Sequence, residues 1–440
     1  MGKVENALKA ARETKALRVG EGKLAEAGSL FREQFANRSA VVVADPTTWE
    51  VAGRAVHECL AAAGIAQQEP FIFTDKHLYA EYGYVDTLVA ALKEHDAVPV
   101  AVGSGTINDL CKLASHLTRR PYVCVATAAS MDGYTAFGAS ITAHGAKQTF
   151  SCPAPQACLA DIDIIRRAPP QMTAAGYSDL FAKVTAGADW ILADALGAEP
   201  VDQQAWDIVQ NGLPEALSAP EKVRSGDPAA IAALTEALLL GGFAMQWSQS
   251  SRPASGAEHQ FSHLWNMEHH THHGQPISHG FQVAIGTLAI TAMYEALLAS
   301  PIDKLNIEAC CAAWQDKEEQ QRETEKMFAG ADFAEVAVCE TLAKYLTREE
   351  LARQLATLKN NWREIQAKLS NQLIPLQEAK RRLQLVGAPT RPEEIGVTEQ
   401  YLRDTFVRAQ HIRRRFTVLD VAVRTGMMME WVEKAVVAIH

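Results

Sequence analysis

The segment Ala97-Val-Pro-Val-Ala-Val-Gly-Ser-Gly105 leads directly into Thr106-Ile-Asn-Asp-Leu-Cys-Lys112. The first part is an apolar, valine-rich run typical of a buried strand, and the second part begins a helical pattern. Gly103 and Gly105 allow a phosphate to approach the backbone closely, and the first N–H groups of a helix attract an anion. A strand, a glycine turn and a helix in this order predict a dinucleotide pyrophosphate site. The alternative is an ordinary glycine turn, because the motif is neither GxGxxG nor a Walker loop.

Working outward from this segment, three further β-rich runs alternate with helical stretches. The runs are SAVVVAD (39–45), PFIFTD (70–75) and YVCVAT (122–127). The helical stretches cover residues 47–64, 84–96 and 106–118. Continuous apolar strands separated by amphipathic helices predict a parallel sheet covered on both faces. Ligands of such sheets bind at the carboxyl ends of the strands.

After about residue 165 the β-rich runs nearly disappear and helical periodicity dominates. The predicted helical stretches cover residues 171–196, 228–247, 280–299, 349–369 and 399–426. We therefore predict a Rossmann-like α/β dinucleotide-binding domain over residues 1–165. An all-α domain over residues 166–440 is expected to bind metal and substrate, and a chain of this length has room for two domains.

The composition narrows the function classes. The chain has 440 residues, a formal net charge of −10, and 48% hydrophobic residues. An acidic chain lacks the general field that holds nucleic acid or an anionic membrane. We expect no membrane-spanning segment. Its eight cysteines form no CxxC pair, which favours a reducing, cytoplasmic location over a disulfide framework.

Polar residues follow two of the predicted strands. Asp45 ends the first β-rich run, where a carboxylate can accept hydrogen bonds from an adenine-ribose diol and so favour NAD over NADP. It is equally well explained as the acid at a helix start beside Pro46. Thr127-Ala-Ala-Ser130-Met-Asp132-Gly133-Tyr134 ends another run. The hydroxyls of this segment can contact nicotinamide or phosphate, and Asp132 can bind a substrate hydroxyl. The alternative is a polar loop that is capped by its own serines.

Seven of the fourteen histidines lie between positions 259 and 279. His259 and His263 are four residues apart and share one face of a helix. His279 follows a Gly-Pro loop and precedes another apolar helix. Asp179 stands in an apolar helical segment, where an unpaired charge is costly and a metal would compensate it. Two imidazoles and a carboxylate leave open positions on a divalent metal, as a catalytic site requires. For His269, His270, His272 and His273 we favour an ordinary role, as solvated loop residues or as core residues with satisfied hydrogen bonds.

Five motifs occur in an order that resembles the sn-glycerol-1-phosphate dehydrogenase family, in particular its bacterial AraM-like branch. They are GSGTINDLCK, TAASMDGY, GYSDLFAK, SGAEHQFSH and SHGFQVAIGTL, and IRRRFTVLDVA near the end of the chain also fits. This family belongs to the superfamily of iron-containing alcohol dehydrogenases and glycerol dehydrogenases. The resemblance implies a dehydroquinate synthase-like fold, a homodimer, and interconversion of dihydroxyacetone phosphate and sn-glycerol 1-phosphate with NAD(H) or NADP(H).

The resemblance also implies roles for particular residues. Asp179, His259 and His279 would bind one divalent metal, zinc, nickel or iron, while Asp132 and His263 would contact substrate. The dinucleotide would be held by Asp45, Gly103, Ser104, Gly105, Thr106, Ile107, Asp109, Thr127 and Ser130. Hydride would pass between the substrate carbon and the nicotinamide, with the metal as a Lewis acid. Lys112, Lys183 and the extra histidines are possible partners of a substrate phosphate.

The chain departs from the family pattern in three places. Phe281 stands where the family often has a glutamate, Ala136 stands where many members have a serine, and HHTHHGQP is inserted near the metal ligands. Two other functions remain open. One is a sugar-phosphate cyclase, a lyase resembling dehydroquinate synthase that also uses NAD and a metal. The other is a metal-sequestering protein, which has no need for the glycine turn.

Overall fold

The structure, a computed structural model, describes residues 3–75, 78–143 and 146–440. By the density of internal contacts the chain divides into two compact units. The first comprises Met1–Leu180 and Asp207–Ser251, and the second Phe181–Trp206 and Arg252–His440. Each unit consists of two separate stretches of the chain. The functional boundary expected at residue 165 therefore stays a prediction.

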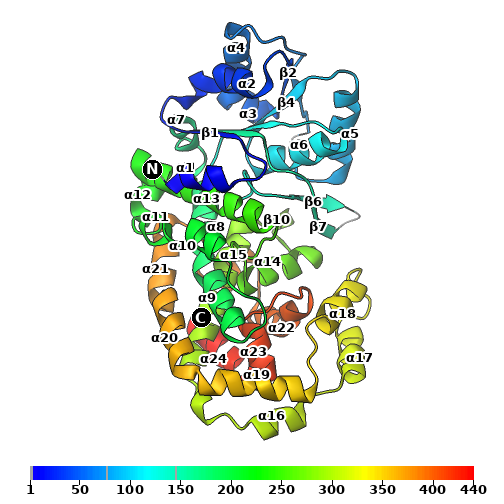
Figure 1. Cartoon of the computed structure of the whole chain (residues 1–440), viewed down its shortest axis with the longest axis vertical. Coiled ribbons are helices and arrows are strands. Elements are labelled where there is room, and N and C mark those ends of the chain that lie inside the picture. Colours follow the sequence, from blue (N-terminus) through cyan, green and yellow to red (C-terminus); the bar gives the residue numbers. More distant parts are fainter. Residues whose placement is uncertain (1–2, 76–77, 144–145) are drawn as a thin grey trace. The chain divides into compact units, whose positions relative to one another are not determined.

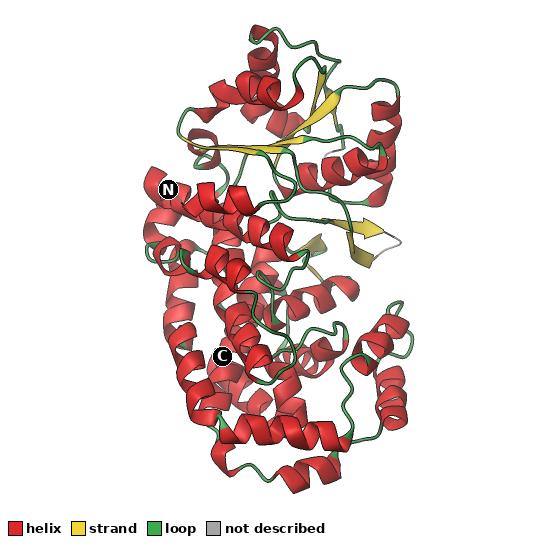
Figure 2. Cartoon of the chain, viewed as in Figure 1, coloured by secondary structure: helices red, strands yellow, loops and turns green. Residues whose placement is uncertain are grey.

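The first unit contains a six-stranded parallel sheet, shown in yellow in Figure 2. Its spatial order is β1 (Ala16–Gly20), β8 (Ala157–Asp161), β5 (Val123–Ala126), β4 (Val98–Gly103), β2 (Ala40–Ala44) and β3 (Phe71–Ile72). All neighbouring pairs run parallel, with register partners such as Val100 and Val123. The predicted Rossmann-like α/β class is confirmed. Because β5, β4 and β2 are adjacent, their carboxyl ends lie side by side.

The strands form because their residues are apolar on both faces, which suits a sheet covered by helices. Val42, Val100, Val102 and Val125 are all buried and belong to one core cluster with Phe31. The helices of this unit are α1 (Lys3–Ala10), η1 (Lys23–Glu26), α2 (Ala27–Phe35), α3 (Pro46–Thr48), η2 (Trp49–Gly53), α4 (Arg54–Ala62), α5 (Tyr82–Lys93), α6 (Gly105–Leu117), α7 (Ile162–Ile165), α11 (Leu213–Ala216), α12 (Pro220–Ser225) and α13 (Pro228–Ser248). A separate antiparallel hairpin joins β6 (Ala139–Ala143) and β7 (Ala146–Phe150).

The second unit is helical, as predicted for the later part of the chain (Figure 1). Its helices are α9 (Lys183–Ala195), α14 (Ala257–Met267), α15 (His279–Leu298), η3 (Ile302–Lys304), α16 (Ile307–Ala313), α17 (Lys317–Met327), α18 (Ala334–Leu342), α19 (Arg348–Asn360), α20 (Trp362–Gln372), α21 (Leu376–Val386), η4 (Pro392–Ile395), α22 (Glu399–Arg408), η5 (Ala409–His411), α23 (Val418–Arg424) and α24 (Met428–Ile439). A two-stranded hairpin, β9 (Thr271–His272) and β10 (Gln275–Pro276), lies in the histidine-rich insert. Two further helices, α8 (Pro170–Phe181) and α10 (Gln203–Gln210), carry the chain across the unit boundaries.

Two helices, α13 and α15, have the length and apolar composition needed to cross a membrane, although the sequence predicts no such segment. In α13, 61% of the most apolar window is buried inside the protein, and in α15 the share is 83%. Helices that are apolar all round and largely covered by protein are typical of a core. α15 packs against α14 and α24, so its apolar surface is used within its own unit.

Candidate functional site

The glycine turn connects β4 to α6 in the predicted order. Ser104 is the N-cap residue, in extended conformation, and its side chain makes no capping hydrogen bond. A Cβ atom on Gly103 would lie 2.6 Å from Cβ of Ile107, so a larger residue cannot occupy this position without a shift. Thr106 and Ile107 follow in the first turn of α6. The turn therefore brings backbone N–H groups to the end of the sheet, as a phosphate site requires.

The segment from Thr127 to Gly133 lies beside this turn. The backbone N–H of Thr127 donates to the carbonyl of Gly103 over 3.1 Å. The Ser130 hydroxyl lies 3.4 Å from the Tyr134 hydroxyl, which donates to the carbonyl of Ala128. α8 packs so closely on this segment that a Cβ on Gly176 would come within 1.9 Å of the Ala129 carbonyl oxygen. Two of the predicted dinucleotide segments are thus neighbours.

Asp45 and Asp109 are each engaged by the protein itself. Asp45 caps α3: its carboxylate accepts from the backbone N–H of Thr48 over 2.8 Å. Asp109 accepts from the backbone N–H of Ser140 over 3.3 Å. The helix-start explanation of Asp45 is therefore confirmed, while a role of either residue in dinucleotide binding stays a prediction.

Lys112 holds the loop that follows Asp132. Its buried ammonium donates to the carbonyls of Gly133, Ala136 and Gly138, each over 2.9 Å. These three carbonyls use all three donors of the ammonium. The suggestion that Lys112 binds a substrate phosphate is therefore wrong: this residue fixes the backbone around Ala136.

Asp179 and the loop containing Asp132 are in contact within the first unit. The backbone N–H of Asp132 donates to Oδ2 of Asp179 over 3.0 Å. Asp179 is completely buried, in the last turn of α8, and Phe181 at the end of this helix already belongs to the second unit. A buried carboxylate requires compensation of its charge, and the amide of Asp132 supplies part of it.

The three predicted metal ligands converge. The ligand atoms offered by Asp179, His259 and His279 all lie within 4.8 Å of one another. His259 lies on α14 and is buried, whereas His279 is the first residue of α15 and is half-buried. Their ring centroids are 5.2 Å apart. One carboxylate and two imidazoles this close together form a set suited to a divalent transition metal.

Glu258, which sequence reasoning missed, orients the ring of His259. Its Oε1 lies 2.8 Å from Nδ1 of His259 and also accepts from the backbone N–H of Gly256 over 2.6 Å. Its Oε2 accepts from the Thr185 hydroxyl over 2.9 Å. Burial raises the pKa of Glu258, but the hydrogen bond and charge of His259 and the Gly256 amide outweigh it and hold the pKa below its ordinary value. An ionised carboxylate only accepts, so when the ring is neutral His259 carries its proton on Nδ1, and Nε2 is the atom that can bind a metal.

A neutral chain of partners orients His279. The Ser262 hydroxyl lies 3.2 Å from Nδ1 of His279 and donates to Oε1 of Gln282 over 2.7 Å. The amide of Gln282 in turn donates to Asn266 over 3.1 Å, which fixes the orientation of Gln282. Because the only hydroxyl proton goes to Gln282, Ser262 accepts from Nδ1 of His279. Both histidines therefore offer Nε2 lone pairs, and the donor set fits a metal.

The start of α14 is tied to a buried acid, Asp189 of α9. Its carboxylate accepts from the backbone N–H of Ala257 over 2.7 Å, from the Tyr294 hydroxyl over 2.6 Å and from the backbone N–H of Val418 over 2.8 Å. A Cβ on Gly256 would lie 2.4 Å from this carboxylate. Burial, and then the charge of Glu258, raise the pKa of Asp189 to about 7. Asp189 thus sets the position from which Glu258 and His259 extend.

The remaining histidines separate into two groups. His263 is half-buried, one helical turn after His259, with its ring centroid 6.4 Å from that of His259. In the insert, His270 Nε2 lies 2.8 Å from the carbonyl of Ile395, and the rings of His272 and His273 are 3.9 Å apart. Among the described residues the only group suited to a metal is the one formed by Asp179, His259 and His279.

Residues 18–169 match the family model of iron-containing alcohol dehydrogenases. The chain is 33% identical over 276 residues to a glycerol-1-phosphate dehydrogenase [NAD(P)+] of Methanosarcina barkeri, and the match covers 63% of this chain and 75% of that relative. The chain belongs to the glycerol-1-phosphate dehydrogenase family. This confirms the resemblance seen in the five motifs.

A second relative of the same name agrees with membership of the glycerol-1-phosphate dehydrogenase family, and a solved structure shows that the fold is shared. The chain is 36% identical over 257 residues to the enzyme of the same name from Halalkalibacterium halodurans, covering 58% of this chain. In that alignment it spans 64% of the relative's length, a little under two thirds. A solved glycerol dehydrogenase from Schizosaccharomyces pombe superposes with a TM-score of 0.60 at 18% identity, covering 96% of this chain and 90% of the other. The fold is therefore shared over nearly the whole chain.

Proposed function

We propose that this protein is a metal-dependent NAD(P)-linked dehydrogenase that interconverts dihydroxyacetone phosphate and sn-glycerol 1-phosphate, or a closely related polyol phosphate. The observation that carries the proposal is the convergence of Asp179, His259 and His279, with both imidazoles turned to offer Nε2. The names of the relatives support the substrate and the dinucleotide.

In this proposal Asp179, His259 and His279 hold one divalent cation. The donor set suits zinc, nickel or ferrous iron. Such a cation supplies Lewis-acid chemistry, which makes a nearby substrate hydroxyl more acidic. Glu258 and Ser262 fix the tautomer and orientation of the two rings, so the ligand atoms are aligned before a cation arrives. The backbone N–H of Asp132 donates to the carboxylate of Asp179 and so fixes the orientation of this third ligand.

The glycine turn holds the dinucleotide, either NAD(H) or NADP(H), in this proposal. The uncapped start of α6, at Ser104 and Gly105, offers N–H groups and a positive dipole end to a pyrophosphate. Thr127 and Ser130 line the neighbouring strand end and would contact the cofactor there. The dinucleotide supplies a nicotinamide ring that accepts or donates hydride, and the protein supplies alignment.

His263 and Asp132 are proposed to contact the substrate. His263 follows His259 by one helical turn and shares its side of α14. A half-buried imidazole near neutral pH can bind a hydroxyl or receive the proton that alcohol oxidation releases. Asp132 follows the dinucleotide segment and is tied through its backbone to Asp179. Two further parts of the proposal are a homodimer, which the family resemblance supports, and a cytoplasmic location, which the eight scattered cysteines support.

A substrate panel with metal analysis tests this function. Dihydroxyacetone phosphate, dihydroxyacetone and glycerol are each assayed with the matching reduced or oxidised form of NAD and NADP, and bound metal is measured on the same sample. We expect turnover with dihydroxyacetone phosphate and about one metal per chain. Metal-replete protein that consumes no NADH or NADPH with any of these substrates would contradict the proposal.

The variant His259→Ala should lose both the metal and turnover while keeping its circular dichroism spectrum. His116→Ala is the matched control, since His116 is an exposed histidine on α6 outside the proposed site. This control should retain both. Full activity of His259→Ala in metal-free buffer would refute the metal-dependent scheme.

A further inference from the structure

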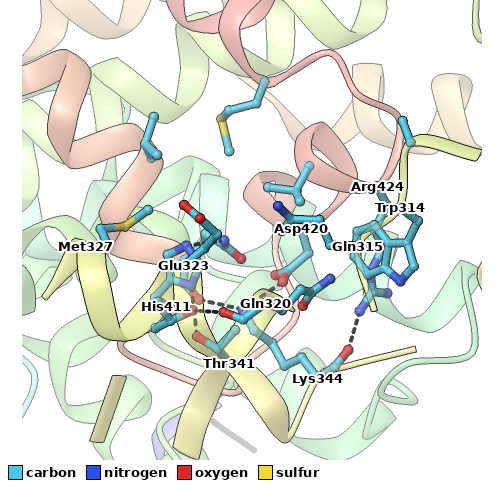
Figure 3. Close-up of a pocket in the computed structure, with 16 residues that line it drawn as sticks. Trp314, Gln315, Gln320, Glu323, Met327, Thr341, Lys344, His411, Asp420 and Arg424 are labelled. Atoms are coloured by element: carbon cyan, nitrogen blue, oxygen red, sulfur yellow. Dashed lines mark hydrogen bonds and ion pairs between the residues drawn. The ribbon is translucent and has the colours of Figure 1, made fainter. Parts of the chain in front are cut away.

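A cavity of about 380 Å³ lies within the helical unit, lined by residues of α17, α18, η5 and α23 among others (Figure 3). None of its lining residues belongs to the proposed metal or dinucleotide groups. Its volume is in the range of small-molecule sites, about 300–1,000 Å³. Half-buried Trp314 gives the wall an aromatic surface, while Lys344, Asp420 and Arg424 give it charge.

The buried charges of this wall do not balance. The Lys344 ammonium lies 2.7 Å from Oδ1 of Asp420 and donates to the carbonyl of Gln410 over 2.6 Å. Arg424 is only 6% exposed, and its hydrogen-bond partners in the described chain are uncharged: the side-chain oxygen of Gln354 and the carbonyl of Lys344. Two buried cations therefore share one carboxylate, which is already paired. A buried charge without a counter-charge is costly.

Other groups around the cavity are consistent with a positive local field. Burial, and then the charge of Lys344, lower the pKa of His411 to about 3. The ring of His411 is satisfied by Thr341 and Gln410, at 2.8 Å and 2.7 Å. Glu323 also lines the cavity, from α17, but it is exposed and forms no ion pair in the described chain. This field is local, since the whole chain carries a net charge of −10.

We propose that this cavity is a binding site for a small organic anion, whose carboxylate or phosphate group is held by the guanidinium of Arg424. A planar guanidinium matches the oxygens of either group and supplies the counter-charge that the wall lacks. Trp314 and the other apolar lining residues, such as Met327, would cover the organic part of the molecule. The site is independent of the proposed dehydrogenase centre.

The test uses the full chain labelled with 5-fluorotryptophan, because Trp314 lines the cavity and reports on it locally. Its fluorine resonance is assigned by the variant Trp314→Phe. Inorganic phosphate and, separately, acetate are titrated at constant ionic strength against chloride. We expect a saturable shift of the Trp314 resonance with at least one of the two anions, and the stronger response shows which oxyanion the site prefers. No saturable shift with either anion would overturn the proposal.

Variants of Arg424 complete the test. Arg424→Gln should abolish the saturable shift. Arg424→Lys keeps the charge but loses the planar guanidinium that can donate two parallel hydrogen bonds, so it should weaken binding about tenfold. Arg382→Gln is the control, because Arg382 is a partly buried arginine already paired with Glu378, and it should bind as the unaltered chain does. If Arg424→Gln does not fold, Arg424→Lys decides alone. Unchanged affinity in either folded Arg424 variant would overturn the proposal.

Discussion

His259 and His279 face the same proposed cation, but the protein supports them differently. Behind His259 stands the completely buried carboxylate of Glu258, held by the Gly256 amide and the Thr185 hydroxyl. Behind His279 stands a neutral hydroxyl, Ser262, at the longer distance of 3.2 Å. A carboxylate partner raises the basicity of a ligand imidazole more than a hydroxyl does. α14 therefore supplies the stronger, more firmly held ligand, and the start of α15 supplies the weaker one.

Among substitutions of the groups that support the two histidines, the largest expected effect is on metal affinity in Glu258→Gln. This change removes the negative charge behind His259 and allows the amide to present an N–H toward the ring. We expect the dissociation constant of the metal to rise about 10- to 100-fold, measured by competition with a chelator. Glu268→Gln is the control, since Glu268 lies at the other end of α14 and pairs with Arg408. Equal affinity in both variants would show that the carboxylate does not orient His259.

A smaller effect is expected for Ser262→Ala, which removes the partner of His279. The ring would lose one neutral hydrogen bond, and Oε1 of Gln282 would lose its donor. We expect metal affinity to fall no more than about tenfold, because a neutral hydrogen bond contributes roughly 1 kcal/mol. The same chelator competition measures it. A loss larger than that of Glu258→Gln would reverse the comparison between the two histidines.

The proposed metal ligands could be predicted from the sequence, but the side chains that orient the two histidines, Glu258 and Ser262, could not. His259 and His263 stand out by their helical spacing, and Asp179 stands out as a lone acid in an apolar helical segment. His279 belongs to the histidine cluster, and the family motifs imply the same metal ligands. Glu258 is adjacent to His259, and neighbours in a helix do not normally face each other. Its contact depends on the turn at Gly256 and on Thr185 from another helix. Ser262 and Gln282 are 20 positions apart and meet only because α14 packs on α15.

The strands of the sheet also divide into those that the sequence made predictable and those that it did not. The valine-rich strands β2, β4 and β5 were predictable because continuous apolar residues suit a sheet covered on both faces. Strands β1 and β8 were missed, since Ala16–Gly20 contains Arg18 and Ala157–Asp161 is built mostly of small residues. Of the run 70–75 only Phe71–Ile72 pairs in the sheet. β1 and β3 are the two edge strands of the sheet, and β8 lies between β1 and β5. The partners of these three strands in the sheet, rather than their own sequences, determine them.

The acids at the start of α14 give a pH-dependent prediction. The pKa of Asp189 rises to about 7 in the folded chain from 3.8, so between these values the folded state holds a proton that the unfolded state releases. The free energy of unfolding should therefore fall as pH rises toward 7, by at most about 1.4 kcal/mol per unit, and level off above it. Glu258, whose pKa is lowered, loses its contribution only at acid pH.

Urea unfolding at pH 5, 6, 7 and 8 measures this slope in the unaltered chain and in Asp189→Asn. The asparagine cannot ionise, so its variant should be less stable but show a flatter pH dependence over this range. Identical slopes in the two proteins would mean that Asp189 is already ionised at pH 5, and that its three donors outweigh its burial.

The smallest effect is expected for a substitution in the histidine-rich insert. This substitution tests whether metal binding is confined to the two ligand histidines and does not involve the histidines between them in the sequence. His270 contacts the carbonyl of Ile395 at 2.8 Å and the ring of Tyr401 at 5.3 Å, so its role is to attach the insert to its own unit. His270→Ala should cost about 1 kcal/mol of stability or less, and leave metal content unchanged. Metal analysis and urea unfolding of one preparation measure both. A drop in bound metal would show that the insert contributes to metal binding. If the ring of His270 only anchors the insert, its loss should not release an ion held by Asp179, His259 and His279.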